Sequence, residues 1–352
     1  MSFFNQLWYH RKHRILGAAL APLEWTYRAG LAIARTGTKT EKVGKPVVSV
    51  GNLTAGGSGK TPLVIELARM LAAAGKRVAV VSRGYKRMTR GILVVHTPGG
   101  PVRPVDEAGD EPALISLRCQ DAGVVVGEDR VAACRMAVER FDPGVILCDD
   151  AFQHRKLHRD LDIVAVHAGH GLGNAHLLPR GPLREPRSAL KRANLVVFTH
   201  ASGGASGGFS AGVSLRGIVP ESIPTAACAF LPAGLTAGAD LQPASPSIDG
   251  PVVAACAVAH PEGFFETCRQ AGLSVAGTMV FPDHHRFTHT DIAAMASLAS
   301  KHGASTVVVS EKDQVRLASL DTPVRFLALR IQAKWVDERS QSQVESILAR
   351  LF

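Results

Sequence analysis

The stretch that most constrains the fold of this 352-residue chain is the segment 47–67, which reads VVSVGNLTAGGSGKTPLVIEL. The β-branched run Val47–Val50 predicts a strand, and the apolar periodicity that starts around Thr61 predicts a helix. The loop between them is rich in glycine, so backbone N–H groups and the helix N-terminus can converge on phosphate oxygens. This order of strand, glycine-rich loop and helix indicates a site for a nucleoside triphosphate.

The loop departs at one position from the strict Gly-x-x-x-x-Gly-Lys-Thr pattern, because Thr54 stands where the first glycine is expected. Lys60 is predicted to reach the outer phosphates, and the hydroxyl of Thr61 is placed to bind Mg²⁺. The alternative is a glycine-rich turn that binds nothing. We predict that the nucleotide contacts come from Thr54, Gly56, Gly57, Ser58, Gly59, Lys60 and Thr61.

The charge of the chain points to an anionic partner. The net charge is +10, and basic residues outnumber acidic ones clearly in the first 45 residues. Such a segment favours either nucleic acid or an acidic membrane surface. Because the basic residues accompany an apolar stripe rather than a base-stacking platform, no nucleic-acid partner is expected.

Residues 3–35 combine a basic cluster at 10–14 with apolar residues spaced three and four apart, which predicts an amphipathic helix. Pro22 is expected to kink this helix. Its apolar run is shorter than the roughly 20 residues that a bilayer span requires. Trp8, Trp25 and Tyr27 suit the headgroup level of a membrane. We predict that the helix lies on an anionic membrane surface; packing on the protein's own core is the alternative.

The rest of the chain alternates apolar strands with helices, which indicates α/β architecture with parallel sheets covered on both faces. A low-complexity segment at 201–212 reads as a flexible loop, and a second α/β pattern follows it. The predicted strands are Val47–Val50, Arg77–Ser82, Ile92–His96, Val124–Val126, Val145–Cys148, Asp162–Val166, Leu195–Thr199, Val252–Val258, Val275–Phe281, Thr306–Ser310 and Val324–Ile331.

Two acidic residues, Asp149 and Asp150, end a predicted buried strand about 90 residues after Lys60. A carboxylate at the end of such a strand is the expected Mg²⁺ partner of a phosphate loop, because this hard cation prefers oxygen ligands. Asp110 is harder to interpret. An Asp before Glu-Pro at a helix start is typical of an N-cap, so local pattern favours a structural role.

His284 and His285 have an ordinary interpretation as surface-loop residues. A zinc site made of His285 and His289 lacks a third ligand at clear spacing and is not favoured.

The chain nevertheless resembles one family in many short stretches. They are GNLTAGGSGKTP at 51–62, SRGYK at 82–86, GDEP at 109–112, GEDR at 127–130, DDAFQH at 149–154, LLPRGPLREP at 177–186, FPDHHRFT at 281–288 and SEKD at 310–313. Together they resemble the tetraacyldisaccharide 4′-kinases of lipid A biosynthesis, in the same order and over nearly the whole chain. Two small departures are Ala151 where Gly is usual and Ser310 where Thr is usual.

The resemblance implies ATP- and Mg²⁺-dependent phosphorylation of the 4′-hydroxyl of a lipid A disaccharide 1-phosphate. It implies a peripheral enzyme at the cytoplasmic face of the inner membrane. We expect a monomer, although the sequence carries no direct signal of the oligomeric state. It also implies a P-loop NTPase-like fold of two α/β/α lobes, with an N-terminal amphipathic helix. The expected parts are the helix at 1–40, a kinase core at 41–215 and a smaller lobe at 216–352, whose final helix could pack back on the core.

The resemblance also implies roles for individual residues. Asp110 with His284 would activate the acceptor hydroxyl, and Lys60 would assist transfer. Because Asp110 and His284 are far apart in sequence and in different predicted lobes, we expect that closure of the lobes brings them together. Whether His284 or His285 is the partner stays open. Arg130, His154 and Arg184 would contact phosphates or the sugar. The Mg²⁺ ligands would come from Thr61, Glu111, Asp149 and Asp150.

A membrane-associated ATPase switch of the partitioning type is the main alternative. Its signature lysine would stand at Ala55, which counts against it. A GTPase is weaker still, because Glu311-Lys312-Asp313 resembles a guanine-reading motif only loosely.

Overall fold

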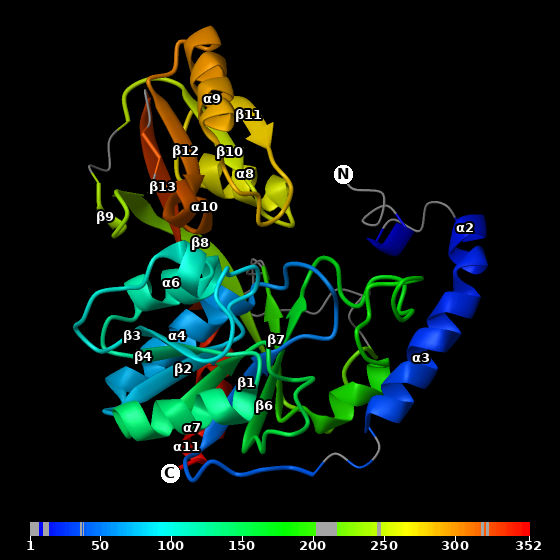
Figure 1. The fold of residues 1–352 in the computed structure, drawn as a ribbon. Helices are drawn as coiled ribbons and strands as arrows, with labels where there is room; N and C mark the ends of the chain where they lie inside the picture. Colours follow the sequence, from blue (N-terminus) through cyan, green and yellow to red (C-terminus); the bar gives the residue numbers. More distant parts are fainter. Residues whose placement is uncertain are drawn as a thin grey trace. The chain divides into compact units, whose positions relative to one another are not determined.

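The computed structural model describes residues 7–9, 14–35, 37, 39–201, 217–244, 248–317, 320–321 and 324–352. Residues 10–13 of the basic cluster and 202–212 of the predicted flexible loop lie outside the described residues. The chain forms two compact units, each assembled from segments that are distant in sequence (Figure 1). The first unit comprises Met1–Ser82, Asp129–Phe230 and Ala333–Phe352, and the second comprises Arg83–Glu128 and Leu231–Gln332. The division at residues 40 and 215 stays a prediction.

The first unit is built on a parallel sheet with the strand order β7–β6–β1–β5–β2. These strands are buried almost throughout, which explains why each reads as a nearly continuous apolar run. Helix α4 packs on β1, β2 and β5, and α7 packs on β2 (Figure 1). The strands are β1 (Val47–Gly51), β2 (Val78–Ser82), β5 (Val145–Asp149), β6 (Leu161–His167) and β7 (Leu195–Thr199).

Helical segments complete the first unit. They are α2 (Arg14–Ala19), α3 (Ala21–Arg35), α4 (Lys60–Ala73), α7 (Arg130–Phe141), the 3₁₀ helix η1 (Arg187–Arg192) and α11 (Glu338–Ala349). The kink expected at Pro22 is instead a break between α2 and α3. Pro22 lies in the first turn of α3, where a missing N–H breaks no helical hydrogen bond. None of the helices among the described residues is long and apolar enough to cross a bilayer.

The second unit contains a parallel sheet with the order β11–β10–β12–β13. An antiparallel pair, β3 and β4, belongs to the same unit. Its strands are β3 (Leu93–His96), β4 (Gly123–Val126), β10 (Val252–Cys256), β11 (Val275–Val280) and β12 (Thr306–Ser310). Its helices are α5 (Val105–Ala108), α6 (Asp110–Arg118), α8 (Pro261–Gln270), α9 (His289–Lys301) and α10 (Glu311–Leu317).

Two long strands, β8 (Thr225–Ala237) and β13 (Arg325–Trp335), each begin in one unit and end in the other. The short strand β9 (Gln242–Pro243) pairs with the end of β8. The sequence did not predict β8, because Pro232 and Gly234 interrupt it and both residues argue against a strand interior. The predicted parallel-rich α/β fold is confirmed.

Candidate active site

The phosphate loop lies at the carboxyl end of β1 and leads directly into α4. Gly59 at the helix N-cap has a φ of 71°, and a Cβ there would lie 2.3 Å from the ring of Phe230. Gly56 has a φ of 106°. Glycine is therefore required at Gly59 by both space and backbone conformation, and at Gly56 by conformation. The N-cap residue Gly59 makes no side-chain capping hydrogen bond to α4, which leaves N–H groups of its first turn for an anion.

Neighbouring segments fix the shape of this loop. The hydroxyl of Thr199, at the end of β7, donates to the carbonyl of Ser58 at 2.8 Å. Thr54 forms an isolated antiparallel bridge with Leu183. The side-chain amide of Asn52 donates a hydrogen bond to the carbonyl of Thr54 at 2.8 Å. The loop is thus held in place by hydrogen bonds of its own unit, which prepares it for a ligand.

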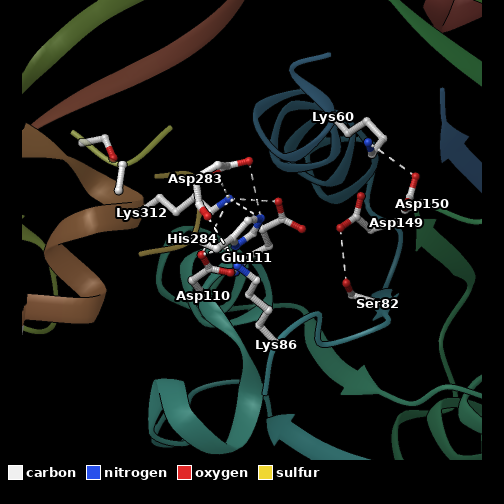
Figure 2. Close-up of polar contacts among 12 residues, drawn as sticks. Lys60, Ser82, Lys86, Asp110, Glu111, Asp149, Asp150, Asp283, His284 and Lys312 are labelled. Atoms are coloured by element: carbon white, nitrogen blue, oxygen red, sulfur yellow. Dashed lines mark hydrogen bonds and ion pairs between the residues drawn. The ribbon is translucent and has the colours of Figure 1, made fainter. Parts of the chain in front are cut away.

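Lys60, the first residue of α4, points its ammonium group at Asp150, with Nζ 3.4 Å from Oδ1 (Figure 2). Arg184 binds the same carboxylate, with contacts of 2.9 and 3.1 Å. Burial alone would raise the pKa of Asp150, but the charges of Lys60 and Arg184 hold it well below its usual range. Asp150 is therefore an anion that fixes the two cations beside the phosphate loop.

Asp149 is the last residue of β5, and its Oδ2 accepts a hydrogen bond from Ser82 at 3.3 Å (Figure 2). Ser82 ends β2, so the two side chains meet at the carboxyl edge of the sheet, where ligands of such sheets bind. In the part of the chain that the structure describes, no group of three or more His, Cys, Asp or Glu side chains could hold a metal ion. Mg²⁺ in kinases needs only one or two carboxylates besides phosphates and water, so Asp149, Asp150 and Thr61 fit it.

Three other predicted site residues belong to the same unit. Arg130 is the first residue of α7 and is buried, while Asp129 caps that helix through the N–H groups of residues 131 and 132. His154 follows the two aspartates in a turn, with its N–H bound to the carbonyl of Ala151. The carbonyl of Arg184 accepts a hydrogen bond from Tyr27 of α3 at 3.1 Å. The loop that carries Arg184 is thereby tied to the N-terminal helix.

Asp110 and His284 lie in direct contact in the second unit, with Nδ1 and Oδ2 2.9 Å apart (Figure 2). The contact needs no closure between lobes, contrary to the expectation from the sequence. Burial alone would raise the pKa of Asp110, but the hydrogen bond from His284 and the charges of Lys312 and Arg316 hold it well below its usual range. Asp110 is 5% exposed and is an anion.

The helix-capping role considered for Asp110 is only partly correct. The N-cap of α6 is Gly109, and Asp110 is the first helical residue. Its Oδ1 accepts the N–H of Glu111 at 2.9 Å, while its Oδ2 accepts from the imidazole. One carboxylate oxygen thus stabilises the start of α6, and the other binds the imidazole of His284.

Sequence reasoning assigned no role to Lys312 and Arg316, which complete this cluster. Nζ of Lys312 lies 3.2 Å from Nε2 of His284 and 3.3 Å from Oε1 of Glu111 (Figure 2). Nε of Arg316 lies 3.4 Å from Asp110. Burial alone would lower the pKa of Lys312, but the surrounding carboxylates raise it above its ordinary value. The SEKD stretch directly after a buried strand was the signal that could have pointed to Lys312.

The structure separates the roles of the two adjacent histidines. Nε2 of His285 lies 3.0 Å from Asp291, which forms the capping box of α9 with Thr288. The ring of His285 also stacks on Phe281, with centroids 5.0 Å apart. His285 therefore stabilises the start of α9, and His284 is the histidine that meets Asp110.

Comparisons with known proteins agree with this geometry. The family model described as tetraacyldisaccharide-1-P 4'-kinase matches residues 16–351. A tetraacyldisaccharide 4'-kinase of Anaeromyxobacter dehalogenans is 40% identical over 331 residues, covering 90% of this chain and 86% of the relative. One of Chromobacterium violaceum is 40% identical over 365 residues, covering 100% and 98%.

Among solved structures, LpxK from Aquifex aeolicus in complex with ATP superimposes with a TM-score of 0.75 and 30% identity. The match covers 96% of this chain and 99% of that one. A partitioning ATPase is not favoured by any of these matches. The chain belongs to the tetraacyldisaccharide 4′-kinase family.

Proposed function

We propose that this kinase transfers the γ-phosphate of ATP to the 4′-hydroxyl of a tetraacyl-disaccharide 1-phosphate in lipid A biosynthesis. The observation that carries the proposal is the phosphate loop, with Lys60 beside the carboxylates that end β5, in a chain of this family. The related Aquifex enzyme was crystallised with ATP, which supports the same nucleotide here.

The first unit supplies the nucleotide contacts. The N–H groups of residues 56–61 cradle the phosphates at the start of α4, and Lys60 turns from Asp150 toward the γ-phosphate. Mg²⁺, when bound, neutralises charge on the β- and γ-phosphates, and Thr61, Asp149 and Asp150 are the side chains that would hold it. Arg184 keeps Asp150 ionised while Lys60 serves the nucleotide.

The second unit supplies the base. His284 takes the proton of the 4′-hydroxyl on Nε2, and Asp110 accepts the hydrogen bond from Nδ1 and stabilises the imidazolium that results. The sugar oxygen bonds to the γ-phosphorus, the bond from that phosphorus to the β,γ-bridging oxygen breaks, and ADP leaves with the electron pair. We further propose that Glu111 contributes to the Mg²⁺ site and that Arg130, His154 and Arg184 bind phosphates or sugar.

We also propose that α3 holds the enzyme, as a monomer, at the cytoplasmic face of the inner membrane. One side of α3 packs on the unit's core through Tyr27 and Leu31. Trp25 and Ile33 lie away from that side and are 67% and 73% exposed. Leu23, one turn before Tyr27, is 53% exposed. Large apolar side chains left in water next to basic residues suit an interface with anionic lipid.

The surface residues of α3 allow a test that spares its packing. Trp25→Glu with Ile33→Glu is expected to lower affinity for anionic vesicles at least tenfold. Burying each such side chain contributes about 1.5–3 kcal/mol, and 1.4 kcal/mol is a factor of ten. The apparent KM for lipid should rise while the KM for ATP stays unchanged. Ile92→Glu, an exposed apolar position in the second unit, is the control. If the α3 double variant bound vesicles as tightly as the wild type and the Ile92→Glu control, the membrane role would be refuted. The helix α3 would then only pack on the protein's own core.

The central test of the proposed function is transfer of radiolabel from γ-labelled ATP to a lipid A disaccharide 1-phosphate in detergent micelles. We expect labelled lipid and ADP in equal amounts. Slow hydrolysis of ATP to ADP and free phosphate, at a rate that does not change when the lipid is added, would instead indicate a nucleotide-dependent switch.

A further inference from the structure

Lys312 lies among groups of opposite charge in the second unit. Besides Nε2 of His284 at 3.2 Å, its ammonium group lies 3.3 Å from Glu111, 3.6 Å from Asp110 and 3.8 Å from Asp283 (Figure 2). Its side chain is only 17% exposed. The lysine thus touches both the proposed base and the carboxylate that orients it.

These contacts determine where the protons of His284 lie. A lysine ammonium group has donors only, so Nε2 must accept the hydrogen bond from Lys312. The Asp110 carboxylate has acceptors only, so Nδ1 must donate to it. Together the two contacts fit a neutral His284 with its proton on Nδ1. In that tautomer the nitrogen that must receive the proton of the acceptor is unprotonated.

The backbone around Lys312 is anchored on both sides. Glu311 accepts from Arg118 of α6 at 2.7 and 2.8 Å, in a pair that is almost fully buried. Asp313 accepts from Ser310 and from the N–H of Ala257. Because α10 is anchored at its first and third residues, the backbone of Lys312 is held in place, with its ammonium group within 4 Å of three carboxylates.

We propose that Lys312 is a positioning residue, which keeps His284 neutral with Nε2 unprotonated and then yields Nε2 to the sugar hydroxyl. The inference rests on the proposed function for its last step. Once Nε2 has taken the proton, an ammonium group at contact distance from the imidazolium would repel it. Glu111 offers the displaced ammonium group an ion pair away from the ring. Asp283 offers a second ion pair, and its carboxylate also lies 3.9 Å from Nε2, where it would stabilise the imidazolium.

A purely structural lysine, which only balances the charge of the carboxylates, makes a different prediction. Its removal would lower stability but would leave the protonation of the ring unchanged. Nitrogen NMR of the histidine side chain distinguishes the two, because the two neutral tautomers and the imidazolium have different ¹⁵N shifts. The signals of His284 are assigned as those that disappear in His284→Asn.

The experiment compares wild type with Lys312→Met, Lys312→Arg and the control Lys301→Met, which removes an exposed lysine charge from the same unit. We expect wild type, Lys312→Arg and Lys301→Met to show the neutral ring protonated on Nδ1 at neutral pH. Lys312→Met should show a largely protonated ring. Its kcat should fall about tenfold or more, since a charge this close shifts protonation by at least that factor, and the lipid KM should stay unchanged.

An unchanged ¹⁵N pattern with unchanged kcat in Lys312→Met would overturn the inference. If that variant does not fold, Lys312→Gln, which lacks the charge, is held to the same criteria. The proposed function is judged separately. Failure of the wild type to phosphorylate the lipid would refute the kinase proposal, whereas the NMR comparison would still decide whether Lys312 controls the protonation of His284.

Discussion

Replacing Lys60 by alanine is expected to lower kcat for phosphate transfer by about 10²–10³-fold, the usual loss when one fixed charge-stabilising donor is removed. Negative charge shifts toward the departing bridging oxygen during transfer, and Lys60 at the mouth of the loop is the side chain placed to meet it. The measurement is steady-state transfer of labelled phosphate to the lipid.

The fold should survive this substitution. Asp150 keeps its ion pair with Arg184, and the buried face of α4, including Leu63 and Leu67, is untouched. The thermal midpoint should therefore remain close to that of the wild type. Lys191→Ala, at an exposed lysine of the same unit, should leave kcat unchanged. Wild-type turnover and ATP affinity in Lys60→Ala would mean that the nucleotide site lies elsewhere.

The phosphate loop could be predicted from the sequence because all of its determinants are local. Strand, glycines, lysine and helix follow one another within residues 47–67, and the conformations that require Gly56 and Gly59 arise from that same segment. The buried strands were equally visible, because strands covered on both faces have nearly continuous apolar runs.

The cluster around His284 could not be predicted in the same way. His284 follows β11, Lys312 follows β12, and Asp110 begins a helix that packs on α10. These residues come together because of the strand order β11–β10–β12, and a local sequence pattern does not predict strand order. The local pattern at Asp110 favoured a cap for the same reason: its partners lie about 170 and 200 residues away.

Asp110→Asn and His284→Ala are each expected to lower kcat by about 10²–10⁴-fold, the typical contribution of a positioned base to activating a weak nucleophile. The substitution at His284 removes the acceptor of the proton. The substitution at Asp110 removes the anion that binds Nδ1–H and stabilises the imidazolium. Because the proposed function assigns both residues to one proton transfer, the double variant should be scarcely slower than the worse single variant.

Stability must be measured beside activity in this cycle. Asp110 is buried beside three basic side chains, so Asp110→Asn should lower the free energy of unfolding by about 1.5–3 kcal/mol, as expected for a lost hydrogen bond to a charged group. Asparagine retains the oxygen that accepts the N–H of Glu111, so the start of α6 should persist. Rates are therefore compared well below the thermal midpoint of each variant. Additive losses would assign the two residues to separate steps. If Asp110→Asn were destabilised but kept a nearly normal kcat, the role of this carboxylate would be structural. It would then only stabilise the start of α6 and balance the neighbouring positive charges.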